Sequence, residues 1–213
     1  MKVTLQNIVP NPMKDEAFSA ESIWGKLCVL DSNHSYLISS NSGKGKSTLL
    51  SYIYGLRADY SGSISIDLEN QKNISIDSWS KLRTNNLSYL LQDLRLFNHL
   101  SVWDNLILKN NLTKHKTASQ IEEMLDAFGM LSKKNQLAGK LSLGQQQRVA
   151  LIRCLLQPFE LLLLDEPFSN IDDTNIQIAK KLINQECKAN NAGFILATLG
   201  HDYQFENVTT IFL

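Results

Sequence analysis

Three short segments of the chain carry residue types and spacings that suit phosphate chemistry, and the first is rich in glycine and serine. Its residues are Ser40, Asn41, Ser42, Gly43, Lys44, Gly45, Lys46, Ser47 and Thr48. Because it follows a strand-like run and opens a helix-like one, its glycines can turn backbone N–H groups toward a phosphate at the positive end of the helix. Lys46 would face the β- and γ-phosphates, and the Ser47 hydroxyl would be a ligand of Mg²⁺. The segment predicts a nucleoside triphosphate site; the alternative is an ordinary turn before a helix.

The second segment is an apolar strand that ends in two acids. Four leucines, residues 161–164, precede Asp165 and Glu166, which places both carboxylates at the carboxyl edge of a sheet, where open α/β folds bind ligands. Since neighbouring side chains of a strand point to opposite sides, we predict two roles. Asp165 reaches Mg²⁺ through its water shell, and Glu166 polarises the water that attacks the γ-phosphate. The alternative is a core strand that merely ends at charged residues.

The third segment lies shortly before the acidic strand and predicts a second helix end suited to an anion. Its residues are Leu141, Ser142, Leu143, Gly144 and Gln145. Ser142 is expected to cap a helix that begins near Gly144, so that a hydroxyl, free N–H groups and the positive end of a helix dipole face an anion.

Length and composition bound the class of protein. The 213 residues fit one domain, or one domain with an inserted lobe, and 21 basic residues balance 21 acidic ones, so nothing in the charge favours nucleic acid as a partner. Apolar runs are far shorter than the ~20 residues that cross a bilayer, and the first residues lack the apolar core of a secretory signal. We therefore expect a cytoplasmic chain, whose three separate cysteines are reduced packing residues.

Strand-like and helix-like runs alternate along the chain, which predicts an α/β fold. Strands are expected at residues 3–9, 25–30, 35–39, 62–68, 87–91, 161–165, 193–198 and 209–213. Helices are expected at 46–54 and 174–189. From about residue 94 to 158 the strand signal disappears, and apolar residues recur at helical spacing around Ile121 and Leu125. We predict a single domain, 1–213, with a core of residues 1–93 and 159–213 and a helical subdomain at about 94–158.

Together the three segments resemble the motifs of ATP-binding-cassette (ABC) ATPases, and the third is similar to the signature motif of that family. The resemblance implies a P-loop NTPase core of the RecA type, with a mixed sheet and an inserted α-helical subdomain, that binds ATP and Mg²⁺. It also implies an ATP-dependent head-to-tail homodimer, in which the signature motif of one copy closes over the γ-phosphate held by the other. The chain departs from the family consensus at Ser40 and Leu143, both normally glycine.

Further positions match family elements in the expected order. Gln92 resembles the glutamine that joins Mg²⁺ and the attacking water, and Ser169 and Asp172 resemble the ends of the loop through which two subunits contact each other. His201 resembles the histidine that contacts the γ-phosphate; its alternative role is that of an ordinary surface or core residue. Phe18 is our candidate for stacking on the adenine.

The histidine segment departs from the family in its spacing. Leu199 and Gly200 follow Thr198, where the family has Thr or Ser directly before the histidine. The distance from His201 to Glu166 is therefore expected to be longer than usual.

The resemblance further implies transport, because such ATPases drive a separate membrane permease from the cytoplasmic face. A short helix of the permease is expected in a cleft beside Gln92. Apolar residues that would line this cleft are Leu94, Leu96, Phe97, Leu100, Val102 and Trp103. The remaining alternatives are a cytosolic ABC ATPase without a transport role, an ABC subunit that hydrolyses ATP weakly, and a P-loop kinase. A kinase would have no use for the third segment or the loop at 169–172.

Overall fold

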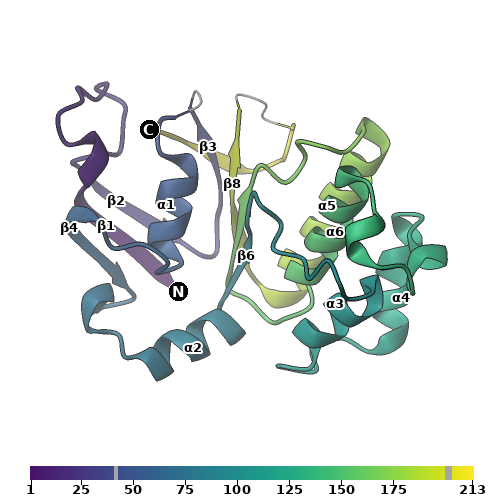
Figure 1. Cartoon of the computed structure of the whole chain (residues 1–213). Coiled ribbons are helices and arrows are strands. Elements are labelled where there is room, and N and C mark those ends of the chain that lie inside the picture. The colour runs from purple at the N-terminus through teal and green to yellow at the C-terminus, as the bar shows by residue number, and fades with distance from the viewer. Residues whose placement is uncertain (41–42, 200–202) are drawn as a thin grey trace.

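The computed structural model describes residues 1–40, 43–199 and 203–213, and these form an α/β fold (Figure 1). The strands are β1 (Lys2–Pro10), β2 (Leu27–Asp31), β3 (Ser35–Ser39), β4 (Tyr60–Ile66), β5 (Glu69–Asn70), β6 (Leu87–Leu90), β7 (Leu161–Asp165), β8 (Gly193–Thr198) and β9 (Val208–Phe212). The α-helices are α1 (Lys46–Ile53), α2 (Ile76–Asn85), α3 (Val102–Asn110), α4 (Ala118–Ala127), α5 (Leu143–Cys154) and α6 (Asp173–Asn190).

The strands divide over two sheets. A parallel sheet has the order β6-β7-β8-β3-β9, and an antiparallel sheet has the order β2-β1-β4-β5. The sequence predicted a mixed sheet. In the structure the parallel strands form one sheet and the antiparallel strands form the other. Because β3 and β7 both flank β8, the turn that follows β3 and the acids that end β7 lie at the same carboxyl edge. Ligands of open α/β sheets bind at such an edge.

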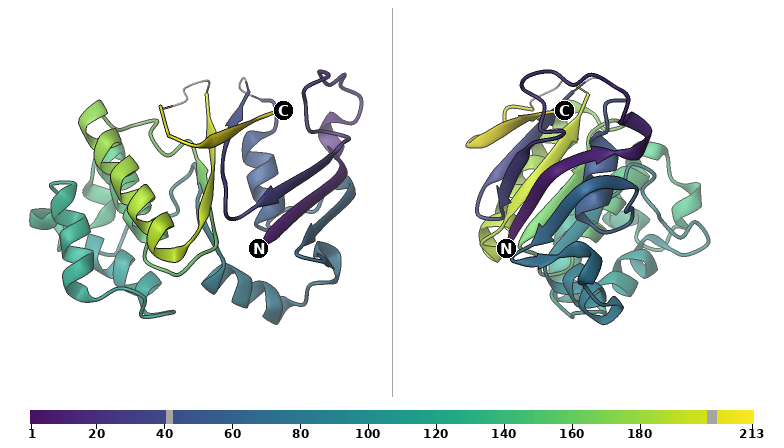
Figure 2. Two further views of the ribbon diagram at one scale, coloured as in Figure 1. Left: turned by 180° about the vertical axis from the view of Figure 1, so that it is seen from behind. Right: turned by 90° about the vertical axis from the view of Figure 1, so that its left-hand side faces the viewer.

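Side chains alternate across the parallel sheet and thereby form two apolar layers. In β7, Leu163 faces the cluster that contains α1 and the antiparallel sheet, whereas Leu162 and Leu164 face the cluster that contains α5 and α6. Figure 1 shows α1 between the two sheets, with α3 and α4 farther out on the opposite side. The view from behind in Figure 2 shows α6 running alongside the parallel sheet. The leucine run of β7 is thus buried on both faces.

Capping residues fix where the helices of residues 94–158 begin. Ser101, Thr117 and Ser142 each accept a hydrogen bond from the backbone N–H three residues later, and the side chain at that position bonds back to the cap. Such capping boxes satisfy N–H groups that a helix end leaves without intrahelical partners. They explain why this stretch forms three separate α-helices. Among the described residues, none of the helices has the length and apolarity needed to cross a membrane.

The cysteines on the helical side of the sheet are packing residues, as the sequence predicts. Cys154 and Cys187 are buried and not disulfide-bonded. Burial raises the pKa of each of these thiols to about 12, because a thiolate would lose its hydration. Both therefore stay protonated and unreactive at neutral pH.

A leucine on β7 tests whether the interior of the parallel sheet sustains the fold. Leu163 is fully buried, whereas Leu68 is fully exposed. Leu163→Ala is expected to lower the free energy of unfolding by about 3 kcal/mol, since it removes buried apolar atoms and leaves a cavity. Leu68→Ala should change it by less than about 0.5 kcal/mol. Urea denaturation of both variants measures the difference, and equal midpoints would contradict the described core.

Candidate functional site

A cavity of about 390 Å³ lies at the carboxyl edge of the parallel sheet and brings the predicted site residues together. Its lining residues are Pro10, Pro12, Met13, Gly43, Gly45, Lys46, Ser47, Thr48, Arg57, Gln92, Glu166 and Leu199. The turn before α1, Glu166 directly after β7 and Gln92 shortly after β6 therefore line the same cavity. Asn41, Ser42 and His201 lie outside the described residues.

The turn before α1 has the backbone geometry of a phosphate-binding loop. Gly43 and Gly45 have φ values of +80° and +93°, a region that other residues rarely adopt. A Cβ on Gly45 would also lie 3.0 Å from the ring of Trp24. No described side chain caps α1, and a helix start that follows a glycine-rich turn suits an anion.

Lys46 lies under this turn and is held by the backbone. Its side chain is 7% exposed, and Nζ donates a hydrogen bond of 2.9 Å to the carbonyl oxygen of Ser40. The contact uses the main chain of Ser40 and is independent of its side chain. This gives a physical reason why serine can replace the family glycine at that position.

Ser47 and Asp165 join the loop to the acidic strand. The Ser47 hydroxyl donates to Asp165 Oδ1 at 3.0 Å, and the Tyr89 hydroxyl lies 3.5 Å from Oδ2. Asp165 is 3% exposed, and burial raises the pKa of its carboxyl because the anion loses hydration there. A cation would offset that loss.

The oxygen atoms of Ser47 and Asp165 suit Mg²⁺ as metal ligands better than they suit a transition metal. Among the described residues, His, Cys, Asp and Glu do not gather in threes as a metal cluster would require. Mg²⁺ takes one or two protein oxygens and fills its remaining positions with phosphate oxygens and water. The Ser47 hydroxyl and the Asp165 carboxylate match that pattern.

Glu166 has an uncommon backbone conformation. Its φ is +50°, a left-handed conformation that costs a non-glycine residue about 1 to 2 kcal/mol. Hydrogen bonds on both sides hold it: Glu166 N–H donates to the Ala197 carbonyl at 2.9 Å, and the Glu166 carbonyl accepts from the Gln147 side-chain amide at 2.8 Å and from the Ser169 N–H at 3.4 Å. The surrounding structure thus fixes the direction in which the Glu166 side chain leaves the main chain.

The third segment caps a helix, as the sequence predicts. Ser142 is the N-cap of α5, and its backbone N–H donates to Gln145 Oε1 at 3.1 Å. A Cβ on Gly144 would lie 2.3 Å from the Asn170 carbonyl oxygen, so this position requires glycine. Leu143, in contrast, is 54% exposed. Its replacement of the family glycine therefore places a side chain in solvent.

The loop at 169–172 lies against this end of α5. Ser169 Oγ accepts a hydrogen bond from the Gln147 amide at 3.2 Å. Asp172 is the N-cap of α6, and its Oδ1 accepts from the Asn175 N–H at 2.9 Å. Hydrogen bonds from Asn175 lower the pKa of the Asp172 carboxyl, so that it is ionised at neutral pH.

Two features of the cavity differ from the sequence-based picture. Phe18 is half-buried against the α1 side of the core and does not line the cavity; Pro12 and Met13 of the same segment do. Arg57, which no motif indicated, lines the cavity and donates to Thr48 Oγ1 at 3.3 Å. Gln147 was also missed. Gln147 contacts residues 166–170, and Arg57 reaches the cavity only in the folded chain, so no local pattern predicts either role.

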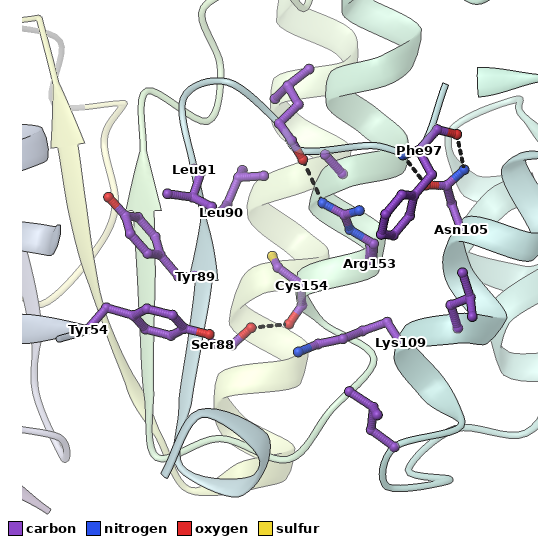
Figure 3. A pocket seen from close by; sticks show the side chains of 14 residues that line it. Tyr54, Ser88, Tyr89, Leu90, Leu91, Phe97, Asn105, Lys109, Arg153 and Cys154 are labelled. Atoms are coloured by element: carbon purple, nitrogen blue, oxygen red, sulfur yellow. Dashed lines mark hydrogen bonds between the residues drawn. The ribbon is translucent and has the colours of Figure 1, made fainter. Parts of the chain in front are cut away.

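A second cavity of about 250 Å³ lies between β6 and the helices α3 and α5 (Figure 3). Leu94 and Phe97, two of the predicted cleft residues, line it, whereas Val102 is buried and Trp103 packs against the helical side of the core. Arg153 lines this cavity beside Phe97 and donates a hydrogen bond to the Leu94 carbonyl at 2.6 Å.

The rim and walls of this second cavity combine apolar surface with positive charge. Leu108 lines it and is 49% exposed, and Lys109 projects into it. Burial lowers the pKa of both Lys109 and Arg153, because each cation loses hydration there. We refer to this cavity as the β6–α3 groove.

Sequence and structure comparisons agree on one family. Residues 29–169 match the sequence model of the family described as ABC transporter. The chain is 37% identical to the thiamine import ATP-binding protein ThiQ of Histophilus somni over 76% of this chain and 74% of that protein. It is 39% identical to ThiQ of Shigella sonnei over 69% of this chain and 62% of that protein. With the sulfate/thiosulfate import ATP-binding protein CysA of Synechocystis it shares 37% identity over 62% of this chain and 36% of that protein.

Solved structures share the fold over nearly the whole chain. A dimeric structure of MJ0796, a bacterial ABC transporter cassette, has a TM-score of 0.81 at 21% identity and covers 99% of this chain and 94% of its own. The same cassette in a post-hydrolysis state with ADP and Pi has a TM-score of 0.79 at 22% identity, with coverage of 98% and 94%.

The position of Lys46 under the phosphate-binding turn yields a prediction. Lys46→Met should weaken ATP binding by about 2 kcal/mol, or roughly thirty-fold in Kd, because a charged hydrogen-bond donor to phosphate is lost. Titration calorimetry with ATP measures the change. Lys81→Met, at an exposed position on α2, is the control. Equal affinities of the two variants would contradict the site.

Proposed function

Since this chain belongs to the ABC transporter family, as the subunit that binds and hydrolyses ATP, we propose a cycle in which two copies close head to tail around ATP. The observation that carries the proposal is one cavity that unites the phosphate-binding turn, Gln92 and Glu166. Binding favours the closed pair because ATP contacts both copies only in that state. Hydrolysis removes those contacts, and the pair reopens.

The position of the α5 end supports a shared site. Ser142 and Gly144 are not among the described residues that line the cavity, although the capped end of α5 suits an anion. In the proposed pair this end binds the γ-phosphate held by the partner copy. The loop from Ser169 to Asp172 lies against α5 and forms the contact between the copies.

In this proposal Ser47, Asp165 through water, and Gln92 would hold Mg²⁺. The ion supplies positive charge against the β- and γ-phosphate oxygens. The Ser47–Asp165 hydrogen bond of 3.0 Å keeps both donors at one place before nucleotide binds. Gln92 lines the cavity and lies on the exposed segment that leads into residues 94–158, so rotation of that helical subdomain would move its amide relative to the phosphates.

Glu166 is the general base of the proposed reaction. Its carboxylate polarises a water molecule for in-line attack on the γ-phosphate. His201 contacts the γ-phosphate and orients that water, and Lys46 remains on the phosphates. Pro12, Met13 and Arg57 line the cavity, and we assign the nucleoside to the side that these residues form.

A separate membrane permease is the proposed partner. The β6–α3 groove begins directly before Gln92, so a permease helix docked there would contact the segment that carries this glutamine. The chain would then be a peripheral subunit on the cytoplasmic face of the membrane. Because the relatives are named import ATP-binding proteins, we propose an importer, with substrate selection by its other subunits.

Glu166→Gln tests the proposed chemistry. The variant should lower the ATPase rate by about a hundred-fold or more, because the amide cannot accept the proton of the attacking water. It should also accumulate as a dimer with Mg-ATP, since hydrolysis no longer separates the copies. Phosphate release and size-exclusion chromatography with light scattering measure the two effects.

The control for this experiment is Glu123→Gln, at an exposed position on α4, which should behave as wild type. A Glu166→Gln protein that hydrolyses ATP at the wild-type rate, or that stays monomeric with saturating Mg-ATP, would contradict the cycle.

Leu108→Asp tests the groove. A carboxylate on this groove wall would lose hydration when a permease helix docks, and recovery of a membrane protein with the tagged chain should fall by roughly ten-fold. Leu68→Asp, at an exposed site outside the groove, is the matched control. ATP binding should be the same in both. Equal recovery of the membrane protein with the two variants would argue against docking at the groove.

A further inference from the structure

Gln147 is a buried amide between α5 and the segment that follows β7. Its side chain is 2% exposed, although its neighbours on the first turn of α5 are accessible to solvent. We infer that Gln147 is a positioning residue that couples the phosphate-facing end of α5 to the backbone of Glu166 in the same chain. The inference rests on the proposed head-to-tail cycle and goes beyond it, because it links one ATP site to the other.

The described hydrogen bonds of the Gln147 side chain go to the segment that carries the proposed base. Nε2 donates to the Glu166 carbonyl at 2.8 Å and to Ser169 Oγ at 3.2 Å, and Oε1 accepts from the Asn170 N–H at 2.9 Å. One side chain therefore spans the whole turn from Glu166 to Asn170. Its donor and acceptor groups are both used, which defines a single orientation of the amide.

The bond to Glu166 acts where this residue is conformationally unusual. The peptide group before its Cα donates to Ala197, and the carbonyl of the peptide group after it accepts from Gln147 at 2.8 Å and from the Ser169 N–H at 3.4 Å. With φ at +50°, the backbone persists in this conformation only while its surroundings hold it. Loss of the Gln147 bond would remove the shortest described hydrogen bond to the second of these peptide groups, which would allow the carboxylate to change direction.

A steric contact makes the coupling stiff. Gly144 lies so close to Asn170 that an added Cβ would be 2.3 Å from the Asn170 carbonyl oxygen. The first turn of α5 and the turn at 166–170 are therefore joined by close packing at Gly144 and by hydrogen bonds at Gln147. A movement of the α5 end would be transmitted to Glu166.

In the proposed dimer, the contact between α5 and Glu166 would connect the two ATP sites. The α5 end of one copy faces the ATP of its partner, whereas Glu166 of the same copy acts on its own ATP. Arrival of the partner's γ-phosphate at α5 would thus align Glu166 in the opposite site. Hydrolysis at each site would depend on occupation of the other.

Gln157 offers a matched control for a purely structural role. It is 1% exposed, and its Nε2 also donates to backbone carbonyls, those of Arg83 at 3.1 Å and Leu87 at 3.0 Å. Gln147→Met and Gln157→Met remove similar buried hydrogen bonds, but only the first removes a contact to Glu166.

The first test compares the ATPase kinetics of these two variants with wild type. Gln147→Met should lower kcat by roughly ten- to a hundred-fold while KM for ATP stays within about two-fold, because misplacement of the base affects the chemical step alone. Gln157→Met should keep the wild-type kcat. Equal kcat values for the two variants would overturn the inference. A wild-type protein that does not turn over ATP would overturn the proposed function and the inference together.

A second test asks on which site Gln147 acts, by joining two copies through a flexible linker. In the cis fusion, one copy carries both Gln147→Met and Glu166→Gln; in the trans fusion, each copy carries one of them. The cis fusion keeps an intact Glu166 with its own Gln147, and its rate should lie within about two-fold of a wild-type/Glu166→Gln fusion. The trans fusion should be roughly ten-fold slower or more.

A trans rate equal to or above the cis rate would overturn the assignment, because Gln147 would then act on the partner's phosphate through α5. If the wild-type/Glu166→Gln fusion is itself inactive, the two sites react only together. The comparison of Gln147→Met with Gln157→Met then decides the inference.

Discussion

The site depends on one hydrogen bond between distant parts of the chain, from Ser47 to Asp165. The two residues are 118 positions apart, and they meet because β3 and β7 both flank β8 in the parallel sheet. The bond fixes the start of α1 against the end of β7. The phosphate-binding turn, the buried carboxylate and the residue after it therefore have fixed relative positions before any ligand binds. Binding of ATP with Mg²⁺ then requires little rearrangement of these groups.

The packing of α5 against the turn at 166–170 is the second constraint, and it explains which departures from the family motif are tolerated. Gly144 meets the main chain at Asn170 and allows no side chain, whereas Leu143 extends into solvent. Ser40 contributes a carbonyl oxygen to Lys46, which any residue could do. The described contact of Ser40 uses its main chain, and the Leu143 side chain is exposed, which gives a physical reason why each replacement is tolerated.

Local sequence patterns predicted the strands and helices that carry the site. The roles of the remaining site residues depend on tertiary contacts. The bounds of β3, β7 and β8 follow from apolar runs with clear ends. The strand expected at 62–68 begins earlier, at Tyr60, because Gly62 lies within the sheet where the main chain of Asn7 approaches closely. Helix α2 was not predicted, since none of its residues is fully buried and only Trp79 and Leu82 are described as packing against the core. Gln147 and Arg57 were missed because neither residue type signals the position it takes in the fold, Gln147 against residues 166–170 and Arg57 at the cavity.

The central claim is that a complete ATP site needs the phosphate-binding turn of one copy and the α5 end of another. Cross-linking between single cysteines at Lys44 and Ser142, both exposed, tests it most directly in a Cys28→Ser, Glu166→Gln background. Cys154 and Cys187 are buried and will not react. Mixing the Lys44→Cys and Ser142→Cys proteins should give a cross-linked dimer with Mg-ATP and none without it. A dimer that forms with ATP but never cross-links between these positions would contradict the shared site.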